Sequence, residues 1–241
     1  MSQRKKKSER RKFFIGSNLA LLVIALFIGV VCLYPASVAT SAGDGVYRRG
    51  TEDSDCVSLL INVYWGTDEV YQMLDTLDEY GAKATFFIGG AWADDNVDCL
   101  KEIVARGHEI GSHGYFHKDC TTLTEEQTAE EINLSRRFLL LAAGVEVDLF
   151  APPSGAYNET TVKVCNDLGM KVILWSKDTV DWRDKDESLC YRRATEGVSG
   201  GDFILMHPMP ATVQALPRIL QYYRENGLRA VTVTENLTYG G

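Results

Sequence analysis

Several signatures of cofactor binding and catalysis are absent from this chain of 241 residues. No GxGxxG or GxxxxGK[ST] motif follows any strand-like segment, which argues against a nucleotide-binding fold. No two cysteines are spaced as CxxC, which argues against a thiolate zinc site. The segment 61–66 (INVYWG) ends an apolar strand-like run and contains no acid, although α/β enzymes usually place a carboxylate there. The chain is therefore either an altered enzyme or a binding protein on an enzyme's frame.

Cysteine usage is compatible with a location outside the cytoplasm but fixes no disulfide. Of the six cysteines, Cys32 lies in an apolar run, and five remain: Cys56, Cys99, Cys120, Cys165 and Cys190. An odd number means that at least one stays free or pairs between chains. A pair between Cys99 and Cys120 is left open, and a buried structural thiol is an equally good interpretation for Cys165.

The N-terminal segment differs from the rest of the chain. Residues 1–12 carry a net charge of +6, and residues 13–34 contain no charged side chain. A run of this length spans a bilayer as a helix, and the basic flank predicts that it stays in the cytoplasm. We expect a cytoplasmic tail (1–12), an uncleaved membrane anchor (13–34), a linker (35–55) and an external domain (56–241) in the cell membrane. The alternative is a secreted protein cleaved near Ala39.

The charge of the external part limits its partners. The whole chain carries −8, so the chain without its +6 tail carries about −14. An acidic domain repels nucleic acid and anionic lipid, so we exclude nucleic acid as a partner and expect membrane contact only through the anchor.

Strand-like and helix-like patterns alternate from residue 57 to the end of the chain. Apolar strands between amphipathic helices predict an α/β fold with a parallel sheet covered on its faces, and seven such units favour an incomplete barrel over an open doubly wound sheet. Helix 123–144 is the clearest, with a capping box of Thr124 and Gln127 and a stop at Gly144. Pro217 is expected to kink the helix over 212–227. The expected strands are 57–65, 84–90, 108–114, 148–155, 171–177, 202–208 and 229–237.

Three of the four histidines lie at the C-terminal ends of expected strands, where a barrel has its active site. His113 and His117 are four residues apart, so a helical turn after Ser112 would let both bind one divalent metal, most simply Zn²⁺. His207 would donate or accept a proton. The fourth, His108, begins a strand at the opposite face and is interpreted as a structural surface residue.

Acidic and aromatic residues after the fifth strand allow two interpretations. Asp178 would hold the second ring nitrogen of His207, or Asp178 and Asp181 would simply cap a loop. Trp175 and Trp182 would be core residues, or Trp182 would be a wall for a sugar ring.

The order of motifs from 57 to 237 resembles the polysaccharide deacetylase family, the NodB-homology carbohydrate esterases. The segments that carry this resemblance are ATFFIGG, GHEIGSHGYFHKDCTTLTEEQTAEEI, WSKDTVDW and ILMHP. The resemblance implies a distorted (β/α)7 barrel and metal-dependent hydrolysis of N-acetyl groups (C–N amide bonds) on N-acetylated glycan such as peptidoglycan or chitooligosaccharide. It gives His113 and His117 the metal-ligand role, His207 the general-acid role and Asp178 the tuning of His207. The implied substrate groove contains Tyr64, Trp65, Pro153, Trp182 and Leu205.

Two motifs depart from the family pattern. The Thr-Phe-Asp-Asp-Gly motif aligns with residues 62–66, so Tyr64 replaces the general base and Trp65 replaces the third metal ligand. The arginine of the Arg-Pro-Pro-x-Gly motif, which holds the base, is Ala151. Loss of the arginine along with its carboxylate avoids an unpaired charge in the cleft.

Two hypotheses remain. In one, Asp68 or Glu69 replaces the lost acids and the chain is a metal-dependent deacetylase; these acids also suit the first turn of a helix for its dipole alone. In the other, a catalytically impaired pseudoenzyme with weak or absent Zn²⁺ binds glycan or a wall-synthesis partner.

Overall fold

The computed structural model of the protein describes residues 45–239. The predicted cytoplasmic tail, the predicted membrane anchor and the first part of the predicted linker lie outside these residues. Between residues 45 and 239, no helix combines the length and the apolar character needed to cross a bilayer.

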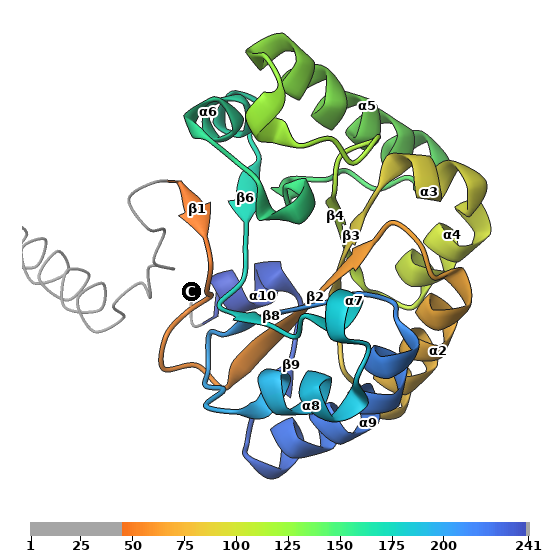
Figure 1. Ribbon diagram of the computed structural model, residues 1–241, viewed down its shortest axis with the longest axis vertical. Coiled ribbons are helices and arrows are strands. Elements are labelled where there is room, and N and C mark those ends of the chain that lie inside the picture. The colour runs from red at the N-terminus through yellow and green to blue at the C-terminus, as the bar shows by residue number, and fades with distance from the viewer. Residues whose placement is uncertain (1–44, 240–241) are drawn as a thin grey trace, which may run out of the picture. The chain divides into compact units, whose positions relative to one another are not determined.

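The strands form one curled sheet in which every paired neighbour is parallel. The hydrogen-bonded order is β1-β6-β5-β4-β3-β2-β8-β7, and β9 pairs with the start of β2. Figure 1 shows these strands curving around a common centre, with most of the helices on the outside. The strands are β1 Val46–Tyr47, β2 Cys56–Val63, β3 Thr85–Ile88, β4 Glu109–Ser112, β5 Leu149–Phe150, β6 Lys171–Ile173, β7 Lys177–Asp178, β8 Phe203–Met206 and β9 Arg229–Ala230.

The helices follow the strands in the predicted alternation. Thr124 and Gln127 form the expected capping box at the start of α5, and Gly144 ends the helix in the left-handed region at φ 71°. Helix α9 runs continuously through Pro217. The helices are α2 Thr67–Glu79, α3 Gly90–Asp95, α4 Val97–Ala105, α5 Glu125–Ala143, α6 Glu159–Asp167, α7 Asp181–Asp184, α8 Glu187–Thr195, α9 Pro210–Glu225 and α10 Val233–Leu237; short 3-10 helices cover Cys120–Thr122 and Pro153–Gly155.

Strand β2 is buried along all eight residues, which explains its nearly continuous apolar sequence. Leu59 and Ile61 belong to the large core that the outer helices cover. Leu60 points to the other side and packs with Phe87, Phe203 and other residues inside the curled sheet. The alternation of side chains along a strand thus supplies two separate cores, and the inner one supports the residues at the strand ends.

The predicted linker ends earlier than residue 55. Val46–Tyr47 form β1 and pair with β6. The Gly50 N–H donates to the Gly201 carbonyl at 2.7 Å, and the Thr51 N–H donates to the Asn236 carbonyl at 3.0 Å. The small, polar composition indicated a linker, but main-chain hydrogen bonds and the buried side chain of Val46 attach the segment to the domain.

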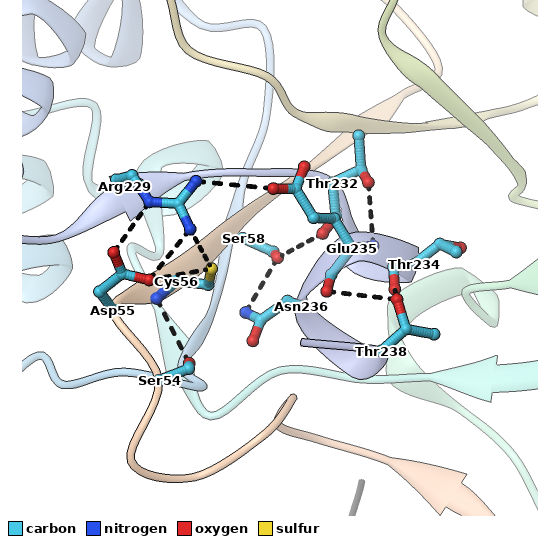
Figure 2. Close-up of polar contacts among 10 residues, drawn as sticks. All are labelled: Ser54, Asp55, Cys56, Ser58, Arg229, Thr232, Thr234, Glu235, Asn236 and Thr238. Atoms are coloured by element: carbon cyan, nitrogen blue, oxygen red, sulfur yellow. Dashed lines mark hydrogen bonds and ion pairs between the residues drawn. The ribbon is translucent and has the colours of Figure 1, made fainter. Parts of the chain in front are cut away.

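The last expected strand, 229–237, is also shorter than predicted. Only Arg229–Ala230 pair as β9, and α10 begins three residues later because the Thr232 hydroxyl accepts the Glu235 N–H at 3.1 Å. Figure 2 shows this cap beside the Arg229–Asp55 ion pair and the Asn236–Ser58 hydrogen bond, which attach this segment to the start of β2. The β-branched residues favoured a strand, but a capping threonine starts a helix.

The cysteines of the described chain form no disulfide. Each is buried and free: Cys56, Cys99, Cys120, Cys165 and Cys190. Of the two interpretations left open for Cys165, the structure agrees with the buried thiol.

Candidate functional site

Three histidines line one cavity at the C-terminal ends of the strands. His113 follows β4, His207 follows β8, and the rings of His113 and His117 lie 4.9 Å apart between centroids. The expected helical turn after Ser112 is absent. Residues 113–117 form a loop in which His117 adopts a left-handed conformation at φ 57°. The convergence of the histidines is therefore confirmed, but the backbone that produces it is different.

Glu131 of α5 anchors this loop. Its carboxylate, buried at 3% exposure, accepts the Phe116 N–H at 2.6 Å. This hydrogen bond holds the turn in which His117 takes its left-handed conformation. Sequence reasoning did not identify this residue, because an acid in a helix is typical of a solvated face.

His113 is held as a neutral ring with a defined tautomer. Its Nδ1 lies 2.7 Å from the Ala151 carbonyl, so Nδ1–H donates and Nε2 keeps a lone pair. Burial lowers the pKa of His113 to about 3, and burial also lowers the pKa of His117. Neutral imidazole is the form that binds a metal ion.

Asp181, rather than the predicted Asp178, pairs with His207. Asp181 Oδ1 lies 2.8 Å from His207 Nδ1, and Oδ2 accepts the His207 N–H at 2.7 Å. The left-handed turn at Val180 starts α7 and places the Asp181 side chain against β8. Asp178 instead accepts the Val180 N–H at 2.8 Å, which is the loop-capping alternative, and it lines the cavity.

Asp181 is fully buried, with further hydrogen bonds from the Thr212 hydroxyl and the Trp182 N–H. Burial raises its pKa, but the hydrogen bonds from His207 and Thr212 outweigh burial, so the pKa of Asp181 lies below its ordinary value of 3.8. The carboxylate therefore stays ionised and fixes a hydrogen on Nδ1 of His207, which leaves Nε2 toward the cavity.

Aromatic rings occupy both positions where the family has acids. The Tyr64 ring packs on His117 with centroids 4.7 Å apart. The Trp65 ring stacks on His207 at 5.6 Å with 6° between the planes, and its Nε1–H donates to Met209 Sδ at 3.2 Å. Neither ring supplies a carboxylate to activate water or bind a metal.

Asp68 and Glu69 do not replace the lost acids. Both lie in the first turn of α2, and neither lines the cavity. Between residues 45 and 239, no group of three or more histidine, cysteine or acidic side chains is placed to hold a metal ion. His113 and His117 would be the ligands of such an ion. Two imidazoles without a third protein ligand do not fit the site that a tightly bound Zn²⁺ requires.

The cavity has a volume of about 300 Å³ and is largely aromatic. Of the predicted groove residues, Tyr64, Trp65, Trp182 and Leu205 line it, whereas Pro153 does not. Ser154 takes its place, because the 3-10 helix over Pro153–Gly155 buries the proline ring. Trp182 is 49% exposed, as a wall open to a ligand would be.

Two further residues line the cavity that the sequence did not place there. Trp175, interpreted as a core residue, packs against the inner core and also lines the cavity. Asn62 is only 4% exposed, and its Oδ1 has no hydrogen-bond partner in the described chain. An amide that replaces the motif's threonine was the available signal for Asn62.

His108 lies at the opposite end of the sheet, as expected, but it is not a surface residue. It is 6% exposed, accepts the Ala84 N–H at 3.3 Å and packs edge-on against Phe86. Burial lowers its pKa to about 4. The strand start is covered by neighbouring loops, which a strand pattern alone does not show.

Comparison with known proteins agrees with this geometry. A peptidoglycan-N-acetylglucosamine deacetylase of Bacillus cereus is 32% identical over 182 residues, which cover 72% of this chain and 85% of that protein. The uncharacterised YlxY protein of Bacillus subtilis is 34% identical over 187 residues, or 78% of this chain. The chain spans only 59% of the length of that relative.

Solved structures show the same fold. A CE4 family pseudoenzyme from Bacillus anthracis superposes with a TM-score of 0.77 at 32% identity, covering 79% of this chain and 68% of that one. A mutant of that protein, described as having restored enzymatic activity, matches with a TM-score of 0.77 at 31% identity and covers 79% of this chain and 70% of its own. The family model for polysaccharide deacetylase matches residues 49–173. The resemblance in the motifs is thus confirmed, and the chain belongs to the polysaccharide deacetylase family.

Proposed function

We propose that this protein binds cell-wall amino-sugar glycan in the aromatic cavity and does not deacetylate it. One observation carries the proposal: Tyr64 and Trp65 stand at the two acid positions and pack directly on His117 and His207. A sugar ring presents apolar C–H faces, and the exposed Trp182 offers a flat surface for such a face.

Hydrolysis of an acetamido group needs an activated water, and the cavity lacks the groups that would activate it. General-base catalysis contributes about 10²- to 10⁴-fold to rate, and no lining carboxylate occupies the position of Tyr64. Loss of the third protein ligand lowers the affinity of the site for Zn²⁺, the ion that would lower the pKa of a bound water. The buried pair of His207 and Asp181 could still protonate a leaving amine, but protonation alone does not supply the attacking oxygen.

The comparisons support this proposal. The Bacillus anthracis protein of the same fold is a pseudoenzyme, and the Bacillus cereus relative acts on peptidoglycan N-acetylglucosamine. From the Bacillus cereus relative we infer the class of glycan that this chain binds. From the altered motifs that replace the acids we infer that this chain, like the pseudoenzyme, does not turn over. The curled sheet is consistent with the distorted (β/α)7 barrel that the family implies.

We further propose that residues 13–34 anchor the domain on the outer side of the cell membrane, with secretion after cleavage near Ala39 as the alternative.

A second candidate is metal-dependent deacetylation, with zinc as the metal. The pair of His207 and Asp181 and the neutral ring of His113 favour it, because these are the groups such chemistry would retain. It requires Zn²⁺ to be held by His113 and His117 with water in the remaining positions.

Binding and acetate release measured on the same glycans decide between the two. We expect N-acetylated chitooligosaccharides or peptidoglycan fragments to bind in calorimetry, with no acetate released when Zn²⁺ is added. Trp182→Ala should weaken binding by at least about tenfold because a stacking surface is lost. Tyr222→Ala, which removes a half-buried aromatic of α9 away from the cavity, serves as the matched control. Zinc-dependent acetate release would establish the second candidate instead, and absence of both binding and release would exclude both.

A further inference from the structure

Within the described chain, no cationic side chain lines the cavity, although it is built at the end of a sheet in a glycan-binding family. The lining includes neither a lysine nor an arginine of residues 45–239, and its one carboxylate is that of Asp178. Ala151 stands where the family has its arginine, and it is 1% exposed. The fixed charge facing a ligand is therefore negative.

Asn62 adds a buried acceptor. It lines the cavity at 4% exposure, and its Oδ1 lacks a hydrogen-bond partner among residues 45–239. Rotation about Cβ–Cγ exchanges the oxygen and the nitrogen of the amide, so the oxygen can face the cavity. In that orientation the oxygen accepts a hydrogen bond from a ligand N–H.

Four aromatic side chains line the same space: Tyr64, Trp65, Trp175 and Trp182. The faces of such rings attract cations, and tryptophan does so most strongly. Ring faces, a carboxylate and an amide oxygen together form the kind of site that accommodates an ammonium group.

We propose that this cavity recognises the free ammonium group of a deacetylated amino-sugar unit in preference to the acetamido group of the acetylated unit. The proposal rests on the glycan binding proposed above and names the form of the glycan. Asp178 supplies the countercharge, Asn62 accepts an ammonium N–H, and Trp65 and Trp182 present ring faces. An acetamido group is neutral and gains no charge–charge attraction from Asp178. The reaction that supplies this ligand is hydrolysis of the acetamido group by another protein, and the cavity binds the glycan product of that reaction.

The test compares oligosaccharides that differ only in acetylation. Fully deacetylated chitosan oligosaccharides are titrated into the full-length protein by calorimetry in 0.15 M salt, beside the same oligosaccharides after chemical N-acetylation. We expect the amine form to bind at least about tenfold more tightly.

Four variants show whether the preference comes from the cavity. Asn62→Leu changes no charge and should reduce the preference for the amine form at least about threefold. Asp178→Asn should reduce the preference by a similar or larger factor. Asp95→Asn removes the same charge from the exposed end of α3, outside the cavity, and should leave the preference unchanged. Trp182→Ala, at a half-exposed position, tests the cavity without disturbing the core.

The outcomes separate this inference from the proposed function. Equal or tighter binding of the N-acetylated form overturns the amine preference and leaves glycan binding intact. Absence of binding by either form removes the proposed function itself. A preference that survives Asn62→Leu and falls as much in Asp95→Asn as in Asp178→Asn comes from general charge attraction, and it overturns the assignment to the cavity.

Discussion

The indole of Trp65 lies parallel to the imidazole of His207, with the ring centroids 5.6 Å apart and 6° between the planes. This contact joins an altered motif to a retained one. The residue that replaces a metal ligand covers the histidine that the family uses as its acid. At both positions where the family has an acid, an aromatic ring of this chain packs on a histidine of the same cavity.

Restoring the family residues at the altered motif positions should restore catalysis if the rest of the cavity still fits the substrate. We expect the triple variant Tyr64→Asp, Trp65→Asp and Ala151→Arg to release acetate from N-acetylated glycan at least about 100-fold faster than the unaltered protein with added Zn²⁺. All three changes are made together. Without the carboxylate at position 64, the guanidinium introduced at position 151 would be an unpaired buried charge. The carboxylate at position 65 supplies the third metal ligand. Acetate release is the measurement. The same triple variant with His113→Ala is the control, and no gain over it would mean that the groove itself has diverged.

Zinc retention should respond to a single substitution. The protein has two imidazoles and no third ligand among its described residues, so we expect less than one equivalent of Zn²⁺ to remain after dialysis. Trp65→Asp should raise the affinity for Zn²⁺ by about tenfold or more, because it adds both charge and chelation. Metal analysis by mass spectrometry gives the result. Trp65→Asn tests whether the charge is needed, and stoichiometric zinc in the unaltered protein would refute the expectation.

The sequence predicted much of this fold because its information is local and repeated. The apolar run of β2, the capping box at Thr124 and the glycine at Gly144 each specify one element. The motifs also placed His113, His117 and His207 at one end of the sheet. Convergence was predictable because parallel strands bring their C-terminal ends together.

The partner of His207 was not predictable from spacing. Asp178 and Asp181 are three residues apart, and the left-handed turn at Val180 decides which carboxylate meets the ring. The orphaned amide of Asn62 is likewise a property of the packed structure, because a lack of hydrogen-bond partners depends on every neighbour. Contacts of this kind are long-range, whereas the sequence signals are short-range.

Asp181 should contribute strongly to stability. Asp181→Asn removes the charge that accepts hydrogen bonds from His207 and Thr212, so we expect a loss of about 2–4 kcal/mol in the free energy of unfolding at pH 7. Urea denaturation measures this loss. Asp178→Asn, which affects one loop hydrogen bond, should cost much less and serves as the control.

The pH dependence of that loss has a defined sign. The pKa of Asp181 is lowered in the folded state, so the unfolded chain takes up the proton first, near pH 3.8. The stability that the carboxylate contributes is complete above pH 3.8 and is lost as the pH falls through the folded-state pKa. The difference between the unaltered protein and Asp181→Asn should therefore shrink below about pH 3.8, and a constant difference down to pH 2 would contradict this.

His108 should destabilise the protein in mild acid. Burial lowers its pKa from 6.5 to about 4, so between these values the unfolded chain binds more protons than the folded one. Stability should fall by about 3 kcal/mol from this group as the pH drops from 6.5 to 4. His108→Asn keeps an acceptor for the Ala84 N–H and should remove this part of the pH dependence in thermal melts. Above pH 7 its slope should match that of the unaltered protein.

The buried thiols should be inert. Burial raises the pKa of Cys56 and Cys99 to about 11 and that of Cys120, Cys165 and Cys190 to about 12. We expect none of these five to react with a thiol reagent at pH 7 in the native state and all five to react in denaturant. Mass spectrometry of the labelled protein counts them. A reducing agent should leave the melting temperature unchanged, and a shift would reveal a disulfide.

Asp181 also explains why the acid half of the motif set persists. Its carboxylate accepts two main-chain N–H groups and a threonine hydroxyl, so it joins α7, β8 and α9 whether or not a reaction occurs. Selection for a folded domain is sufficient to retain this residue, with or without turnover. Genome searches that count the His207–Asp181 pair as proof of hydrolysis will therefore overestimate the number of active deacetylases.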